Sequence, residues 1–199
     1  MSIRTVQLKK ILIVCLCLCY YFPATAILIK EEIKRPVSLK NDLVPVQKAI
    51  IRFLQWYKIN LHKANSFPLL KKDSAANYMV NKKAVTDYLN FLKGSKCISN
   101  KYITHWQIYF DDKADQLKKD KIQSDIPEGF DMDFVLITQE PEIVLDNIGR
   151  LKFKTVSMNS TVALIGVQLP SDNSVQYEFE MYKTKDGWRI GYISTPNYD

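Results

Sequence analysis

Acidic residues and tyrosines supply the groups in this sequence that could support proton-transfer chemistry. Asp131, Asp133 and Glu140 flank an apolar run, and the chain has 11 Tyr. Catalysis by such groups needs a carboxylate whose pKa is raised by burial and a phenol directed at a developing oxyanion. With so many tyrosines and surface acids, such a pair arises easily by chance, and aspartates commonly bond backbone N–H groups in turns. We therefore expect a loop or cap role for Asp131 and Asp133, and we assign no catalytic residue.

The other reactive side chains form no recognised site. His62 and His105 are the only histidines, and neither has a His, Cys or carboxylate at a metal-ligand spacing. Cys97 and His105 could act as nucleophile and base, but a lone thiol in an apolar neighbourhood is usually packed and inert. The sequence has no Gly-x-Ser-x-Gly elbow, Walker loop or dinucleotide fingerprint. We predict no metal and no cofactor.

The first 26 residues are typical of a cleavable export signal. A basic segment, an apolar segment and a small-x-small cleavage motif follow one another: Arg4, Lys9 and Lys10; residues 11–22; Ala24 and Ala26. The apolar segment is shorter than the roughly 20 residues that span a bilayer, and no later stretch approaches that length. We predict cleavage before Ile27, a periplasmic location and no stable membrane insertion after cleavage.

The cysteines agree with an export signal that is removed. Cys15, Cys17 and Cys19 lie in the apolar segment and leave with it, so only Cys97 remains and no intramolecular disulfide is possible. The small residue that usually precedes a lipidated cysteine is missing, so we do not expect a lipoprotein.

Charge and length describe an ordinary folded domain. Removal of residues 1–26 takes away three basic and no acidic residues, which leaves 25 Lys+Arg against 21 Asp+Glu, a formal charge of +4. Both signs are interspersed, which favours a solvated surface over a nucleic-acid-binding face. We divide the chain into the signal peptide, a charged leader at 27–43, one domain at 44–195 and a tail at 196–199.

Three helices are predicted in the first half of the domain. The first starts near Pro45 and carries an apolar stripe: Val46, Ile50, Phe53, Leu54, Tyr57 and Leu61. The second has Asn81 as a cap, Gly94 as a stop and its own stripe: Val85, Tyr88, Leu89 and Leu92. The third covers residues 102–110 and fades into the charged tract 111–121.

Two features of this half are candidates for contacts. Trp56 lies beside the first stripe rather than on it, and could line a pocket mouth or a partner surface. The charged tract 111–121 is typical of a solvated face or a mobile loop, with a recognition loop as the functional alternative.

From about Leu151 the hydrophobic period changes from 3.6 to 2, which predicts strands. The expected strands are four, and Asp186-Gly187 is a strong hairpin signal between the last two: residues 152–157, 162–169, 175–182 and 188–192. The second is apolar on both faces, so we expect it in the centre of the sheet. Helices followed by an antiparallel meander predict an α+β fold.

The element order, ending in Asp-Gly-Trp-x-Ile, resembles the nuclear transport factor 2-like, or cystatin-like, cone fold. Four segments are similar to a bacterial exported family described only as a domain of unknown function: residues 53–57, 78–92, 130–140 and 175–193. The resemblance implies three N-terminal helices packed on a curved antiparallel sheet of about four strands. Two departures are a longer tract at 113–127 and Glu140 in place of a frequent aspartate.

The resemblance and the lack of a reactive motif favour an exported, non-catalytic binding protein. Its protein partner would be an envelope protein or a toxin that it neutralises as an immunity protein, and the oligomeric state is open. Candidate binding residues are Trp56, Asp131, Asp133 and Glu140. Two alternatives remain: a small pocket enzyme of isomerase or dehydratase type, as in the ketosteroid isomerase-like branch of the fold, or an envelope carrier of a small apolar ligand. The enzyme requires a buried acid facing a Tyr hydroxyl, and the carrier a cavity of several hundred Å3.

Overall fold

The structure is a computed structural model that describes residues 39–172 and 174–196. Three long helices come first, with a two-stranded hairpin between the first two: α1 (Leu39–Asn65), β1 (Leu70–Lys72), β2 (Tyr78–Val80), α2 (Lys82–Lys93) and α3 (Asn100–Asp120). Two short helical turns and four strands follow: α4 (Glu142–Leu145), η1 (Ile148–Arg150), β3 (Lys152–Met158), β4 (Val162–Gln168), β5 (Tyr177–Thr184) and β6 (Gly187–Ser194). The predicted α+β class is confirmed. The predicted export signal, with Ala24 and Ala26, lies outside the described residues.

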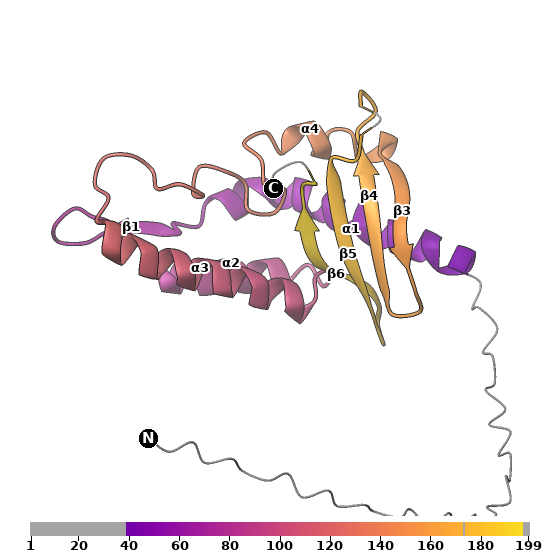
Figure 1. The fold of residues 1–199 in the computed structure, drawn as a ribbon, viewed down its shortest axis with the longest axis horizontal. Coiled ribbons are helices and arrows are strands. Elements are labelled where there is room, and N and C mark those ends of the chain that lie inside the picture. Colours follow the sequence, from indigo (N-terminus) through magenta and orange to yellow (C-terminus); the bar gives the residue numbers. More distant parts are fainter. Residues whose placement is uncertain (1–38, 173, 197–199) are drawn as a thin grey trace, which may run out of the picture. The chain divides into compact units, whose positions relative to one another are not determined.

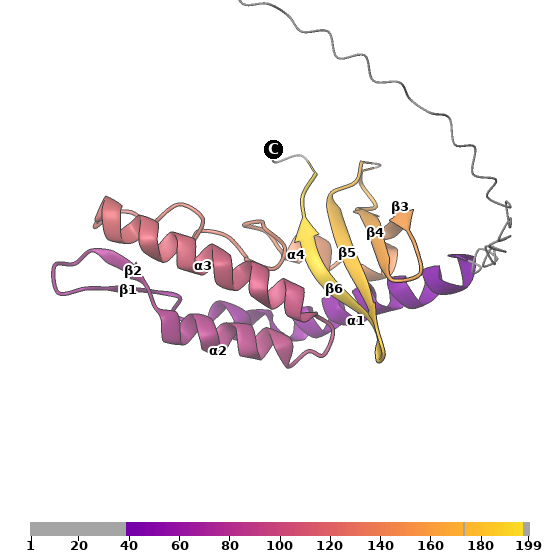
Figure 2. The ribbon, with the colours of Figure 1, turned by 60° about the horizontal axis from the view of Figure 1, so that its bottom comes forward.

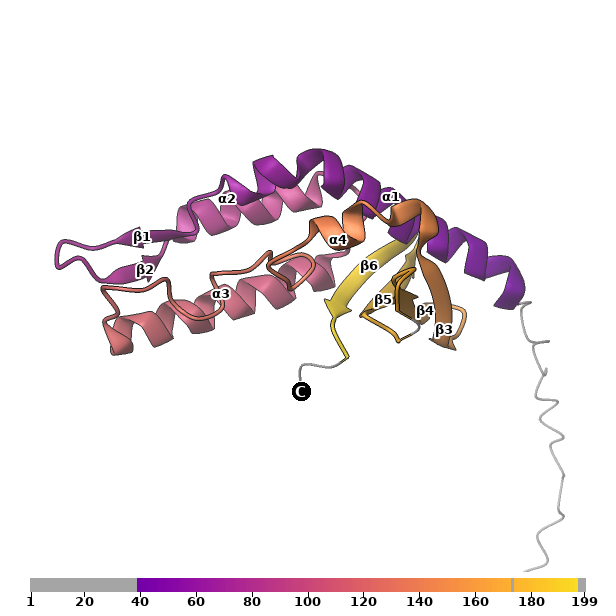
Figure 3. The same cartoon turned by 90° about the horizontal axis from the view of Figure 1, so that it is seen from above.

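Helix α1 covers one face of the sheet and also packs against α2 and α4 (Figures 1 and 3). Five residues of its predicted stripe are completely buried, namely Val46, Ile50, Phe53, Leu54 and Tyr57, and the sixth, Leu61, is partly buried.

The predicted start of α1 was wrong. The helix begins at Leu39 rather than near Pro45, within the segment that we had assigned to a leader, and Pro45 lies inside it. Proline has no N–H to donate within a helix, so it is most common in the first turn, where N–H groups have no helical partner. For this reason Pro45 indicated a helix start.

Helices α2 and α3 lie side by side and are capped as their sequences require (Figure 2). The Asn81 side chain accepts a hydrogen bond from the Ala84 amide at 3.4 Å, and α2 ends at Gly94 as predicted.

Helix α3 continues through the charged tract to Asp120, because Leu117 is buried and extends the apolar face of Phe110. The tract is therefore the solvated face of a helix and not a loop.

The four-stranded sheet is antiparallel in the order β3-β4-β5-β6, so β4 is central as predicted. Gly187, at φ +108°, closes the predicted hairpin between β5 and β6. The loop before α3 joins the edge of the sheet, since the Ser99 amide donates to the Ile190 carbonyl at 2.8 Å and the Ile190 amide to the Cys97 carbonyl at 2.9 Å. This pairing ties the α2–α3 pair to the sheet.

The β1–β2 hairpin was not predicted. Each strand has three residues and little apolar alternation, so the sequence carries no strand signal there. Tertiary contacts form it: the Tyr78 amide donates to the Ile122 carbonyl at 2.8 Å, and Lys72 Nζ to the Gln123 carbonyl at 3.0 Å. The hairpin is thereby joined to the chain that follows α3.

Among the described helices, none has the length and apolar character needed to cross a membrane.

Candidate functional site

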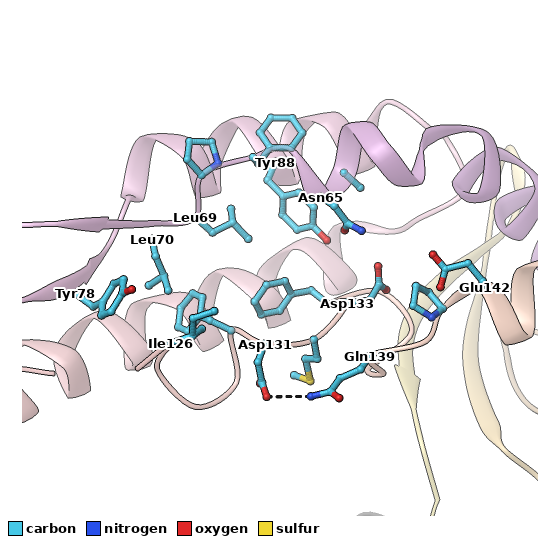
Figure 4. Close-up of a pocket in the computed structure, with 17 residues that line it drawn as sticks. Asn65, Leu69, Leu70, Tyr78, Tyr88, Ile126, Asp131, Asp133, Gln139 and Glu142 are labelled. Carbon is cyan, nitrogen blue, oxygen red and sulfur yellow. Dashed lines mark hydrogen bonds between the residues drawn. The ribbon is translucent and has the colours of Figure 1, made fainter. Parts of the chain in front are cut away.

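A pocket of about 630 Å3 opens where the end of α1, the hairpin, α2 and the chain before α4 meet (Figure 4). Its lining comes from the last residues of α1, residues 67–70, Tyr78, Tyr88 and the segment 126–142. We call it the Asp133 pocket. Ten of its 17 lining residues are apolar and seven carry polar groups, so hydrocarbon surface and hydrogen-bonding groups meet in it, as they do in small-molecule sites.

Asp133 is the centre of the loop that forms one wall, and it is only 7% exposed. Its Oδ1 accepts hydrogen bonds from the Val135 amide at 3.0 Å and the Leu136 amide at 2.7 Å. Its Oδ2 accepts a short hydrogen bond from the Tyr57 hydroxyl of α1. Val135 and Leu136 are fully buried, so their amides have no access to water and depend on this carboxylate. The predicted cap role is what the geometry shows for Asp133.

Burial raises the pKa of Asp133 above its usual range. The hydrogen bonds from Tyr57, Leu136 and Val135 lower this pKa in part, and the negative charge of Glu142 raises it further. Burial also raises the pKa of Tyr57 and Tyr88, with the Asp133 charge adding to both shifts, so both phenols keep their protons. The site thus contains a buried carboxyl group close to protonated phenols.

The raised pKa predicts how Asp133 changes stability with pH. The native pKa lies above the unfolded value of about 4, so the Asp133 contribution to stability is fully present below that value. It is lost as the pH rises through the native pKa. In urea unfolding from pH 4 to pH 7, the stability of the wild type relative to Asp133→Asn should be greatest at pH 4 and fall towards neutrality. A difference that grows towards pH 7 would show that the three hydrogen bonds favour the carboxylate more than burial disfavours it.

Three buried tyrosines near Asp133 have hydroxyl groups in different situations. The Tyr57 hydroxyl donates to Asp133. The Tyr102 hydroxyl is sealed in the core without a hydrogen-bond partner, although the Trp106 indole lies close enough to offset part of the rise in the Tyr102 pKa that burial causes. Tyr88 is 2% exposed and lines the pocket, and its hydroxyl has no hydrogen-bond partner among the described residues.

Removal of the hydroxyl should therefore have opposite effects at Tyr57 and Tyr102. We expect Tyr57→Phe to lower the free energy of unfolding by about 1–3 kcal/mol, because Asp133 loses a buried donor. Tyr102→Phe should leave stability unchanged or raise it by about 1 kcal/mol, because a buried hydroxyl without a partner costs its desolvation energy. Chemical denaturation of the two single variants measures both changes, and equal losses would contradict the assignment.

Aromatic rings pack against Phe134 in the pocket wall. Phe134 contacts rings from α2, α3 and its own loop, with ring-centroid distances between 5.1 and 6.4 Å: Tyr88, Trp106, Tyr109, Phe110 and Phe130. The Tyr109 hydroxyl donates to the Gly129 carbonyl at 3.0 Å, and burial raises the pKa of Tyr109 to about 12. Gly129 has φ +83°, which favours glycine at this close approach. The wall is held by α2 and α3, the helices that carry Tyr88 and Tyr102.

Two of the predicted binding residues line this pocket and two do not. Asp131 lines it at the surface and accepts a hydrogen bond from Gln139 Nε2 at 3.2 Å, and Asp133 lines it in the interior. Trp56 packs instead against Phe91, with ring centroids 5.2 Å apart. Glu140 is exposed and is not among the lining residues, although it immediately precedes the lining residue Pro141.

Sequence reasoning missed Tyr57, Tyr88 and Glu142. Both tyrosines fell on apolar helix stripes and were interpreted as core, which their burial bears out. The signal that could have identified them is the hydroxyl group itself, because a phenol in a fully apolar stripe needs a buried partner. Nothing in the local sequence indicated that Asp133 is that partner for Tyr57.

The histidines and the cysteine lie away from the pocket. His105 is exposed on α3 beside the Tyr192 ring, with centroids 4.5 Å apart, and partial burial lowers its pKa. Cys97 is buried at the edge of the sheet, and His62 is exposed in the last turn of α1. Within the described ranges, no three His, Cys, Asp or Glu side chains are placed to hold a metal ion.

Comparison of the chain with protein-family models, curated proteins and solved structures found no match.

Proposed function

We propose that this chain is an exported, non-catalytic binding protein of the bacterial periplasm and that the Asp133 pocket is its binding site. The observation that carries the proposal is the hollow of about 630 Å3 with a wall of mixed apolar and polar side chains, a size within the roughly 300–1,000 Å3 of ligand sites. Export is supported by the basic, apolar and small-x-small segments that end at Ala26.

The engagement of Asp133 supports binding rather than turnover. Its two oxygens accept three hydrogen bonds from within the protein, so the carboxylate holds the pocket wall together. The Tyr57 hydroxyl is directed at Asp133 and not into the pocket volume that a substrate would occupy. Donors that already bind a carboxylate weaken it as a general base, and three hydrogen bonds from the protein reach this one.

The preferred partner is a toxin from a neighbouring cell, which the chain would bind as an immunity protein. Exposed apolar residues around the pocket support a protein contact: Ile126 lines it and is 59% exposed, and Ile143 follows the lining residue Glu142. Large exposed aliphatic side chains next to a pocket are typical of interfaces.

The partner test uses a matched pair of variants. The chain should copurify from the native envelope with one toxin, encoded beside it, and co-expression should protect cells from that toxin. Ile126→Asp should abolish protection, whereas Ile59→Asp, at a residue 83% exposed on α1 and outside the pocket lining, should leave it intact. Loss of protection in both variants, or a clean monomer with no partner in a neighbouring gene, would contradict the proposal.

Cell fractionation tests export independently. A C-terminally tagged chain should appear in the periplasmic fraction with Ile27 as its first residue by mass spectrometry. A cytosolic product that keeps residues 1–26 would be incompatible with the proposed location.

A small pocket enzyme of isomerase or dehydratase type is the second candidate, favoured by the buried Asp133 carboxyl group beside the Tyr57 hydroxyl. The assay is conjugation of a β,γ-unsaturated ketone, followed by absorbance, with the wild type and Asp133→Asn. Turnover above buffer that Asp133→Asn abolishes would replace the binding proposal with this one.

The four-stranded antiparallel sheet, with helices before it in the chain, supports the proposal of a nuclear transport factor 2-like cone fold and of the exported family of unknown function. The Asp133 pocket is lined by no residue of β3–β6, so it is distinct from a pocket between helices and sheet. An experimental structure with a flat sheet that α1 does not cover would contradict this fold assignment.

A further inference from the structure

We propose that the Asp133 pocket binds an organic cation: an ammonium or guanidinium group on an apolar stem, as presented by a lysine or arginine side chain of a protein partner. The inference rests on the proposed binding function and names the chemistry of the group that enters the pocket.

The charge of the lining is the first reason. Asp131, Asp133 and Glu142 contribute carboxyl groups, and none of the 17 lining residues is a Lys, Arg or His. No ion pair within the described part of the chain involves any of these three carboxylates. Negative charge of this kind repels an anion and is relieved by a cation.

The Tyr88 hydroxyl is the second and independent reason. Its residue is almost wholly buried, yet its oxygen has no hydrogen-bond partner among the described residues and points into the pocket (Figure 4). Because this oxygen borders the pocket and no described group binds it, it can accept an N–H from a ligand.

Asp133 retains capacity for one more donor. A carboxylate offers about four acceptor positions, and Asp133 uses two on Oδ1 and one on Oδ2. An ammonium group in the pocket that Asp133 and Tyr88 both line can therefore donate to Asp133 as well. The charge of Glu142, which raises the Asp133 pKa in the unliganded chain, would be offset by the same cation.

The walls suit an apolar stem behind the charged group. Leu69, Leu70 and Met132 provide hydrocarbon surface, and the Phe130 and Phe134 rings add aromatic surface. A neutral apolar ligand would fill the same space but leave Tyr88 and Asp133 without the extra donor. A bare metal ion would use neither the rings nor the hydrocarbon.

The experiment titrates the mature chain with three molecules of similar size by calorimetry: n-hexylammonium, 1-hexanol and hexanoate. We expect n-hexylammonium to bind at least about tenfold more tightly than 1-hexanol, because hydrogen bonds to charged groups are the stronger ones, and hexanoate to give no binding. Equal affinity for the ammonium and the alcohol would overturn the cation assignment while keeping the pocket as a binding site.

Matched variants locate the effect. Tyr88→Phe should weaken n-hexylammonium about five- to tenfold while unfolding at the same denaturant concentration, because its hydroxyl holds no part of the fold. Glu142→Gln should weaken binding about threefold, and Glu140→Gln, the same change outside the lining, should not alter it. Equal effects of the two glutamine variants, or an unchanged affinity in Tyr88→Phe, would overturn the assignment.

Two further arms separate the sources of the cation and the two proposals. A blocked Leu-Lys-Leu peptide that binds more tightly than n-hexylammonium supports a protein side chain, and the reverse order supports a free amine with the same chemistry. No binding of the ammonium probe or the peptide overturns the cation assignment, whereas the partner proposal is judged separately by copurification and by the Ile126→Asp variant.

Discussion

Replacement of Asp133 by alanine should lower the free energy of unfolding by about 3 kcal/mol. The variant leaves the Val135 and Leu136 amides and the Tyr57 hydroxyl buried without their acceptor. Each unsatisfied buried group costs about 1–3 kcal/mol, and partial relaxation of the loop keeps the sum below three full penalties. Urea unfolding followed by circular dichroism measures the change.

Two controls give this result its meaning. Asp131→Ala changes an exposed carboxylate of the same loop and should stay within about 0.5 kcal/mol of the wild type. Asp133→Asn keeps one acceptor oxygen for the two amides and should lose less than half as much as the alanine variant. An alanine variant as stable as the wild type would mean that the carboxylate does not hold the loop.

Replacement of Phe134 by alanine should cost about 3–4 kcal/mol. Phe134 is 8% exposed and contacts five other aromatic rings, the nearest being Phe110 at 5.1 Å between centroids. Truncation removes both the buried area and the ring contacts and leaves a cavity between α3 and the loop. Thermal or chemical unfolding measures the loss.

Phe134→Leu is the volume-matched control and should cost about 1 kcal/mol, since it refills most of the cavity. Ile143→Ala, at an exposed aliphatic residue in α4, should be nearly neutral. If Phe134→Ala costs no more than Phe134→Leu, the loop is not anchored through this ring. Asp133 and Phe134 are adjacent, so the hydrogen bonds of Asp133 and the ring contacts of Phe134 hold the pocket wall at the same place in the chain.

Much of the framework could be predicted because its signals are local. The α1 stripe, the Asn81 cap and the Asp186-Gly187 hairpin each depend on residues a few positions apart, and the structure confirms all three. Local signals failed where a distant contact decided the outcome. The β1–β2 hairpin forms against residues 122 and 123, and α3 runs past Phe110 because Leu117 is buried there.

The pocket itself illustrates the limit of periodicity. Tyr57 and Asp133 are 76 positions apart and meet because α1 and the loop after α3 pack together. A period of 3.6 places Tyr57, Tyr88 and Tyr102 on buried helix faces. It does not say that the Tyr57 hydroxyl bonds to a carboxylate, that the Tyr102 hydroxyl is sealed in the core, or that the Tyr88 hydroxyl faces the pocket. Those differences depend on the relative positions of whole elements.

The order of the residues by itself determines helices followed by an antiparallel meander. Burial of one face requires apolar residues at a period of 3.6 in a helix and of 2 in a strand, and the sequence contains both periods in that order. The arrangement of Asp133, Tyr57, Tyr88 and Glu142 around one cavity emerges from packing, because hydrogen bonds and electric fields act over a few ångströms in space and not along the chain.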